Sequence, residues 1–267
     1  MKNFKNVNTE LIKSGAPLTT VAEQVKELTV DRLTVGEYEL PWVQGGVCDG
    51  KYLYQFIVSR DSKHCVIVKQ DMATLQVVAK SEDMMLGHAN DGAYNPNNNT
   101  IAIPHCCDLD SPSYNIIYLV DAEKLTLIKK LELPKYDLFA ITYNENTRQY
   151  ITASEEEMHY WDEDFNLLDT KPILITPGWP SQGIECDGEY VYRLEFFLNK
   201  KPSGEIIEMK NNMHVNDVTT GEEVALIPVN VPLESEHMFI YNGEFYVVCN
   251  NRRWTGSDIF RFKIISE

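Results

Sequence analysis

The chain has 267 residues, enough for one large β domain or two ordinary domains, and 43% of them are hydrophobic, so it can bury a sizeable core. Its formal net charge of −16 argues against binding to nucleic acid or to an anionic membrane, because both need a basic surface. A soluble protein with a self-repelling surface is the simplest explanation of this acidity.

The N-terminal region and the cysteines indicate a cytoplasmic protein. No apolar run follows the first lysines, as a signal peptide would require, and no stretch of about 18 apolar residues suits a membrane-spanning helix. The six cysteines show no CxxC spacing, and several lie within apolar strand patterns. We therefore expect buried, reduced thiols rather than a disulfide framework.

Residues 1–32 differ from the rest of the chain and are predicted to form an N-terminal extension. Apolar residues recur at helical spacing over residues 17–28, and Pro17 suits the first turn of a helix. Thr20 and Glu23 resemble a capping box. We expect a short amphipathic helix over residues 17–28 on the surface of the main domain, followed by a strand over residues 33–40.

From residue 42 onward, a strand–turn–strand phrase recurs five times. Its copies begin 43 to 55 residues apart, at positions 44, 90, 139, 182 and 237. Three copies place Asp-Gly or Asn-Gly between alternating apolar residues, which is a strong hairpin signal, and the other two have longer Asn-rich turns. A third and a fourth strand follow each of the first four hairpins. Four short strands per repeat are typical of the blades of a β-propeller.

The fifth repeat contains only three predicted strands. We expect the strand over residues 33–40 to supply the fourth, so that the ring closes between the two ends of the chain and leaves no open edge. The sequence thus predicts an all-β fold, a five-bladed β-propeller over residues 33–267, closed by an N-terminal strand and preceded by a short N-terminal helix. A β-sandwich is the alternative all-β fold, but it requires no such period.

Two phrases carry a resemblance to known propellers. Gln44-Gly45 and Gln182-Gly183, each followed by an Asp-Gly hairpin, are similar to phrases in many bacterial propellers and in plant-type glutaminyl cyclases. In the cyclases the second blade carries a catalytic glutamate at the corresponding phrase, where this chain has Asn90. The resemblance therefore implies the fold and not the cyclase activity, because propellers host many unrelated functions.

A propeller gathers loops from all its blades around one funnel, so residues distant in sequence converge there. Polar groups beside aromatic rings at such a mouth favour the binding of a small polar molecule or a glycan fragment. The expected stacking faces are Trp42, Phe139 and Trp179. The expected hydrogen-bonding and charged partners are Gln44, His88, Asn90, His105, Gln182, His237 and Arg252.

Acid–base catalysis is the main alternative function. Asp91, Glu155 and Glu195 come from three different blades, as the acids of propeller glycosidases do. Retaining and inverting hydrolysis need carboxyl separations of roughly 5–5.5 Å and 6.5–9.5 Å, and a sequence does not define these. In the simpler interpretation, Asp91 caps a turn and Glu155 belongs to a solvated acidic loop.

Two further interpretations remain. His88, His105 and His237 come from three loops and could form a metal site, but no pair shows a close motif such as HExxH. We therefore expect neither a metal ion nor a cofactor. A protein-interaction scaffold is the third candidate function, and it would use the blade rims and the helix expected over residues 17–28. The sequence does not define the oligomeric state.

Overall fold

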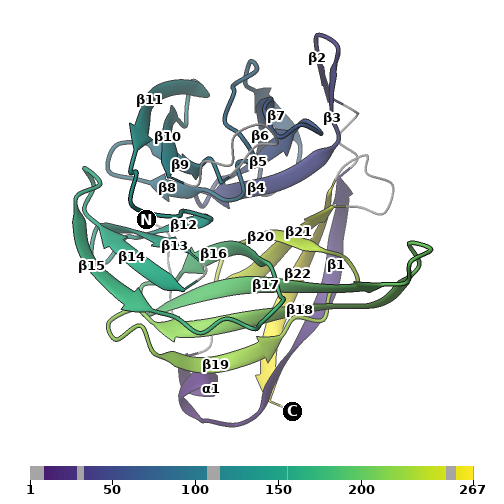
Figure 1. The fold of residues 1–267 in the computed structure, drawn as a ribbon, viewed down its shortest axis with the longest axis vertical. Coiled ribbons are helices and arrows are strands. Elements are labelled where there is room, and N and C mark those ends of the chain that lie inside the picture. Colours follow the sequence, from purple (N-terminus) through teal and green to yellow (C-terminus); the bar gives the residue numbers. More distant parts are fainter. Residues whose placement is uncertain (1–8, 29–32, 107–114, 155, 251–256, 267) are drawn as a thin grey trace.

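The computed structural model describes residues 9–28, 33–106, 115–154, 156–250 and 257–266, in which five antiparallel sheets of four strands surround a common axis (Figure 1). The first strands of neighbouring sheets contact one another all around the ring. The protein is therefore a five-bladed β-propeller, as the repeat predicts.

The blades follow the chain in order, and each runs from an inner to an outer strand. Blade one comprises β4 (Trp42–Cys48), β5 (Tyr52–Val58), β6 (Cys65–Asp71) and β7 (Val77–Lys80). Blade two comprises β8 (Ala93–Asn95), β9 (Thr100–Pro104), β10 (Ile116–Asp121) and β11 (Thr126–Glu132). Blade three comprises β12 (Ala140–Asn144), β13 (Gln149–Ala153), β14 (Glu157–Trp161) and β15 (Leu167–Pro172). Blade four comprises β16 (Ser181–Cys186), β17 (Tyr190–Lys200), β18 (Ile206–Asp217) and β19 (Glu223–Pro228). Blade five comprises β20 (Ser235–Tyr241), β21 (Glu244–Asn250), β22 (Ser257–Ser266) and β1 (Leu18–Leu28).

Burial explains why the strands differ in composition. Strands near the axis are packed on both faces by adjacent blades, so β5 and β9 are almost continuously buried. Outer strands such as β7 and β11 are mostly exposed and carry charged residues. In the described part of the chain five cysteines are free and buried, as expected. No helix of the described residues is long and apolar enough to span a membrane.

The Asp-Gly turns of blades one and four are built alike. Asp49 Oδ1 accepts the backbone N–H of Tyr52 at 2.6 Å, and the Tyr54 hydroxyl donates to Oδ2 at 2.8 Å. Asp187 accepts the corresponding bonds from Tyr190 and Tyr192 at 2.8 and 2.7 Å. The glycine that follows each aspartate adopts a positive φ, which glycine tolerates without steric cost. The carboxylate thus ties each hairpin to its own second strand.

The ring is closed by an N-terminal strand, but by different residues from those predicted. β1 pairs antiparallel with β22, with Leu18 opposite Ser266, so the helix expected over residues 17–28 is wrong. Leu18 and Thr20 are buried while Val21 is 59% exposed, which is closer to the alternation of a strand. The long-range hydrogen bonds to β22 outweigh the local helical pattern, and the Thr20 hydroxyl donates to the Pro228 carbonyl at 3.0 Å.

Residues 33–40 do not close the ring. They form a separate hairpin of β2 (Leu33–Val35) and β3 (Tyr38–Leu40), with Gly36 at φ 59° in the two-residue turn (Figure 1). The chain reverses direction at Gly36, so residues 33–40 cannot form one continuous strand. The predicted closing strand is wrong for this reason. The short N-terminal helix exists as α1 (Thr9–Lys13), and its Ile12 packs into the core of blades four and five.

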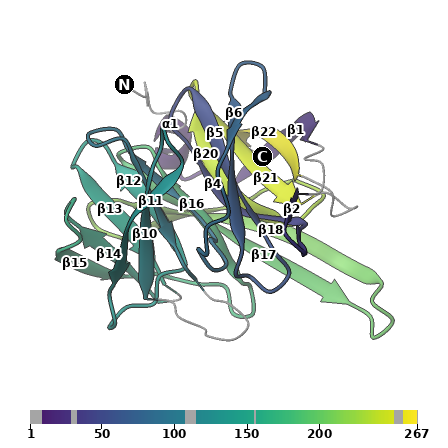
Figure 2. The ribbon, with the colours of Figure 1, turned by 90° about the horizontal axis from the view of Figure 1, so that it is seen from above.

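One element departs from the ring. The long hairpin of β17 and β18 extends well beyond the other strands of blade four (Figure 2). Its outer part carries Ile206 and Ile207, which are 50% and 57% exposed. The base of this hairpin lies beside the funnel and helps to form the cavities described below.

Candidate functional site

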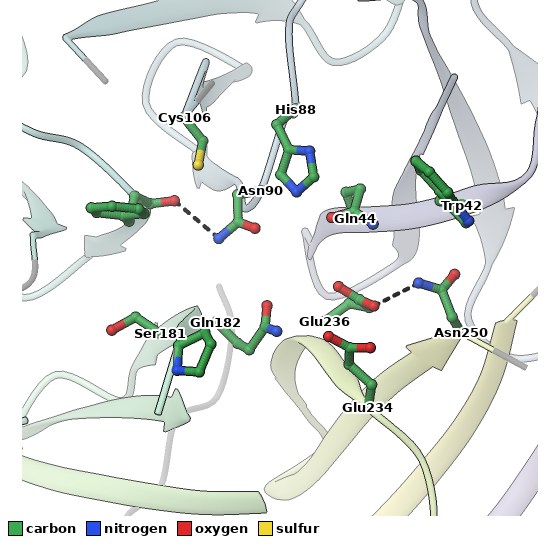
Figure 3. A pocket seen from close by; sticks show the side chains of 12 residues that line it. Trp42, Gln44, His88, Asn90, Cys106, Ser181, Gln182, Glu234, Glu236 and Asn250 are labelled. Atoms are coloured by element: carbon green, nitrogen blue, oxygen red, sulfur yellow. Dashed lines mark hydrogen bonds between the residues drawn. The ribbon is translucent and has the colours of Figure 1, made fainter. Parts of the chain in front are cut away.

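A cavity of about 360 Å³ opens at one mouth of the ring, and residues from all five blades line it (Figure 3). Six of the predicted ligand-binding residues line this cavity: Trp42, Gln44, His88, Asn90, Phe139 and Gln182. The remaining lining residues are Cys106, Pro180, Ser181, Glu234, Glu236 and Asn250. The ring therefore brings together most of the binding residues expected at the funnel.

Three irregularities in the inner strands aim side chains into the cavity. The pairing of β4 with β5 shifts between Val43 and Gly45, next to Gln44. Equivalent shifts occur at Gln182 in β16 and at Glu236 in β20. A β-bulge redirects a side chain and is common beside functional sites. Blades one, four and five thus use the same device to present a polar group to the funnel.

The glycine after each glutamine allows the blades to approach. A Cβ on Gly45 would lie 2.3 Å from the Ala89 carbonyl oxygen, and one on Gly183 would lie 2.8 Å from His237 Cα. Neither space accommodates a side chain, because real Cβ contacts are longer. The Gln-Gly phrase therefore combines a polar group aimed into the funnel with close contact between neighbouring blades.

Three amide side chains in the cavity keep free hydrogen-bonding capacity. Gln44, Asn90 and Gln182 are 8%, 5% and 7% exposed. Asn90 Nδ2 donates to the Phe139 carbonyl at 3.2 Å, which leaves its Oδ1 facing the cavity (Figure 3). Gln44 and Gln182 have no side-chain hydrogen bond to any other described residue. Amides that are this buried normally have partners, so these three polar groups remain available to water or to a ligand in the cavity.

Glu234 and Glu236 also line the cavity, although neither was a predicted site residue. Asn250 Nδ2 donates to Glu236 Oε1 at 2.6 Å, and the same amide exchanges two hydrogen bonds with the Val43 backbone at 2.9 and 3.0 Å. Burial and the neighbouring Glu234 raise the pKa of Glu236 well above its usual value. Burial also raises the pKa of Glu234, against the attraction of Lys200.

The His88 side chain is uncharged at neutral pH. His88 Nδ1 lies 3.0 Å from the Ser62 hydroxyl. Burial, with a smaller contribution from His105, lowers the pKa of His88 to about 4. At neutral pH the uncharged imidazole can therefore accept or donate a hydrogen bond in the cavity. Cys106, on the same side of the cavity, adopts a positive φ of 58°.

Three predicted ligand-binding residues do not line this cavity, and a fourth falls outside the described residues. His105 is buried behind the cavity, with Nδ1 3.1 Å from the Tyr118 hydroxyl. His237 is fully buried, and it lies against Gly46 of blade one and Gly183 of blade four. Trp179 lines a neighbouring cavity, and Arg252 lies outside the described residues.

Of the three predicted catalytic acids, the two that the structure describes, Asp91 and Glu195, do not line the funnel cavity. Asp91 is fully buried, and its Oδ2 accepts the backbone N–H groups of Ile141 and Ile184 at 3.0 and 2.9 Å. Burial raises the pKa of Asp91 well above its usual value. Glu155 lies outside the described residues. Asp91 therefore joins the inner strands of blades three and four rather than facing a ligand.

Glu195 is fully buried and belongs to a chain of side-chain contacts with His214 and Glu223. Its Oε2 lies 2.8 Å from His214 Nε2, and His214 Nδ1 contacts Glu223. Its Oε1 accepts the backbone N–H of Thr176 at 3.1 Å. Burial opposes ionisation, but the hydrogen bonds from His214 and Thr176 prevail and lower the pKa of Glu195. This carboxylate thus fixes the rim loop of blade four.

The described residues offer no cluster of three His, Cys, Asp or Glu side chains arranged to hold a metal ion. The histidines considered for such a site are separated: His88 faces the cavity, while His105 and His237 are buried in different blades.

No family model matches the chain, and no curated protein matches its sequence. Solved structures do match its fold. Glutaminyl cyclase from Myxococcus xanthus is 10% identical at a TM-score of 0.59, over 94% of this chain and 99% of that one. Hydrazine synthase from Kuenenia stuttgartiensis is 13% identical at a TM-score of 0.46, over 90% of this chain and 66% of that one. The β-propeller domain of Cps50 from Myceliophteria thermophila is 8% identical at a TM-score of 0.43, over 86% and 98%. At 10% identity the similarity to the cyclase structure shows the propeller fold alone.

Proposed function

We propose that this propeller binds a small polar molecule or a glycan fragment in its funnel. The observation that carries the proposal is the set of amides of Gln44, Asn90 and Gln182, which are almost buried and keep hydrogen-bonding capacity toward the cavity. Trp42 and Phe139 flank them with aromatic surface. A concave site with aromatic walls and a few convergent polar groups suits a ligand rich in hydroxyl or amide groups.

Thermal-shift screening of a metabolite and glycan panel, followed by calorimetry on each hit, tests this proposal. Gln44→Ala and Gln182→Ala are expected to weaken binding by roughly fivefold to tenfold each, because each removes a hydrogen bond worth about 1 kcal/mol. Gln76→Ala is the matched control, since Gln76 is an exposed glutamine far from the funnel. Equal affinities in all three variants would show that the ligand binds outside the funnel.

Catalysis is the second candidate function, and one observation favours it. Glu234 and Glu236 both line the funnel, and the raised pKa of Glu236 is the property that a general acid needs. This second candidate places the acid–base role on the acids of blade five, because Asp91 and Glu195 do not line the cavity. Glu236→Gln is expected to bind ligand with little change and to abolish any turnover. Undiminished turnover in Glu236→Gln would eliminate Glu236 as the acid.

A further inference from the structure

The funnel continues into two more cavities along the rim of blade four. A second cavity, of about 380 Å³, shares Phe139, Pro180 and Ser181 with the funnel. A third, of about 450 Å³, shares Trp179 with the second. Each is large enough by itself for a small ligand, since such sites have volumes of roughly 300–1,000 Å³. The second and third cavities lie beside each other between the funnel and the base of the β17–β18 hairpin, and together they are called the groove.

Trp179 stands between the second and third cavities as a fixed aromatic surface. Its ring stacks on Phe197 of β17, with centroids 5.1 Å apart and an interplanar angle of 25°. Its backbone N–H donates to the Thr176 carbonyl at 3.0 Å, and Thr176 is bound in turn to the buried Glu195. The ring is therefore positioned before any ligand arrives, which lowers the entropic cost of stacking against it.

The groove is nearly uncharged. Among the described residues that line the second and third cavities, Lys210 alone carries a charge. Ser181 and Asn212 supply hydroxyl and amide groups along its length. The net charge of −16 disfavours an anionic chain.

We propose that the funnel receives one end of a linear, uncharged oligosaccharide whose following units lie along this groove and stack on Trp179. The inference rests on the proposed function and extends it from a single polar molecule to a chain. Two aromatic surfaces, Phe139 and then Trp179, suit the apolar faces of successive sugar rings, and the Ser181 hydroxyl in the same cavity suits a ring hydroxyl.

Calorimetry with matched ladders of cello-, xylo-, malto- and arabino-oligosaccharides, each from the monosaccharide upward, tests the proposal. In one ladder, affinity is expected to rise as units are added. Trp179→Ala is expected to cost the longer members roughly twofold to tenfold, the range for one aromatic contact, and to leave the monosaccharide unchanged. Trp179→Phe keeps an aromatic surface and is expected to restore most of the gain. Thermal melts of both variants confirm that the blade still folds.

The outcomes separate this inference from the proposed function. Monosaccharide binding that is sensitive to Gln182→Ala but gains nothing with length would leave the funnel proposal standing and overturn the extended chain. A Trp179-dependent length effect seen with short peptides and absent from every sugar ladder would overturn the glycan assignment. Metabolites that bind the funnel without any sugar doing so would also overturn it.

Discussion

Replacement of Asp91 tests whether this buried acid is structural or functional. One of its oxygens, Oδ2, accepts both backbone N–H groups from blades three and four, while Oδ1 has no hydrogen-bond partner among the described residues. Asn places an amide oxygen where Oδ2 lies and therefore preserves both bonds. Ala leaves two buried N–H groups unsatisfied, at about 1–3 kcal/mol each. We expect Asp91→Ala to lose about 2–6 kcal/mol, a large part of a typical domain stability of about 5–15 kcal/mol.

The pH dependence of the same variants supplies a second, independent readout. The raised pKa of Asp91 means that the folded state keeps its proton after the unfolded chain has lost it. The stability contributed by Asp91 is thus complete below the unfolded pKa of about 4, and it falls as pH rises toward the folded pKa, by at most about 1.4 kcal/mol per pH unit. Asp91→Asn lacks this loss, so it is expected to match the wild type near pH 4 and to exceed it at pH 7.

Urea denaturation between pH 4 and pH 8 measures both effects. Asp91→Asn and Asp91→Ala are compared with the wild type at each pH, with the m-value as a check on two-state behaviour. An Asp91→Asn protein much less stable than the wild type at pH 7 would refute the reasoning. It would mean that the folded protein needs the negative charge of Asp91.

Three further predictions concern other buried contacts. Glu195 has a lowered pKa, so it stabilises the folded protein above the unfolded pKa of about 4.3, and this contribution is lost as pH falls. In denaturant melts, the stability of Glu195→Gln should therefore change less with pH on the acid side than that of the wild type. Asn250→Leu breaks the bonds to Val43 and Glu236 and should cost about 2–4 kcal/mol in the same assay, whereas an unchanged midpoint would contradict the link between blades five and one. Thr20→Val removes two bonds that hold β1 and should accelerate hydrogen exchange in β1 but not in β13; equal exchange in both strands would show that Thr20 does not anchor β1.

The repeat was readable from the sequence because each blade carries its own local signals. The Asp-Gly turns at Asp49 and Asp187 and the alternation around them depend on neighbouring residues, so they identify hairpins without knowledge of the fold. The closing strand was not readable in this way. β1 is a strand only because β22 lies beside it, and the apolar spacing of residues 17–28 suits a helix equally well.

The residues of the candidate site also fall into two groups, those marked by local sequence signals and those whose position depends on the fold. Gln44 and Gln182 were found because the Gln-Gly phrase repeats, and Trp42 and Phe139 because they are aromatic residues at the start of inner strands. His237 was chosen for the site in place of its neighbour Glu236 because simple alternation does not locate a bulge, and the register shifts between Ser235 and His237. His237, which was predicted to bind the ligand, is instead fully buried.

The pairing of β1 with β22 has a consequence for biosynthesis. A ribosome produces β1 early and β22 late, so blades one to four can condense while β1 still lacks its partner. Until β22 emerges, the nascent chain exposes an unpaired edge that can join another molecule. Ring closure by β1 and β22 therefore makes the chain dependent on chaperones during translation. At high concentration it also allows two copies to exchange β1.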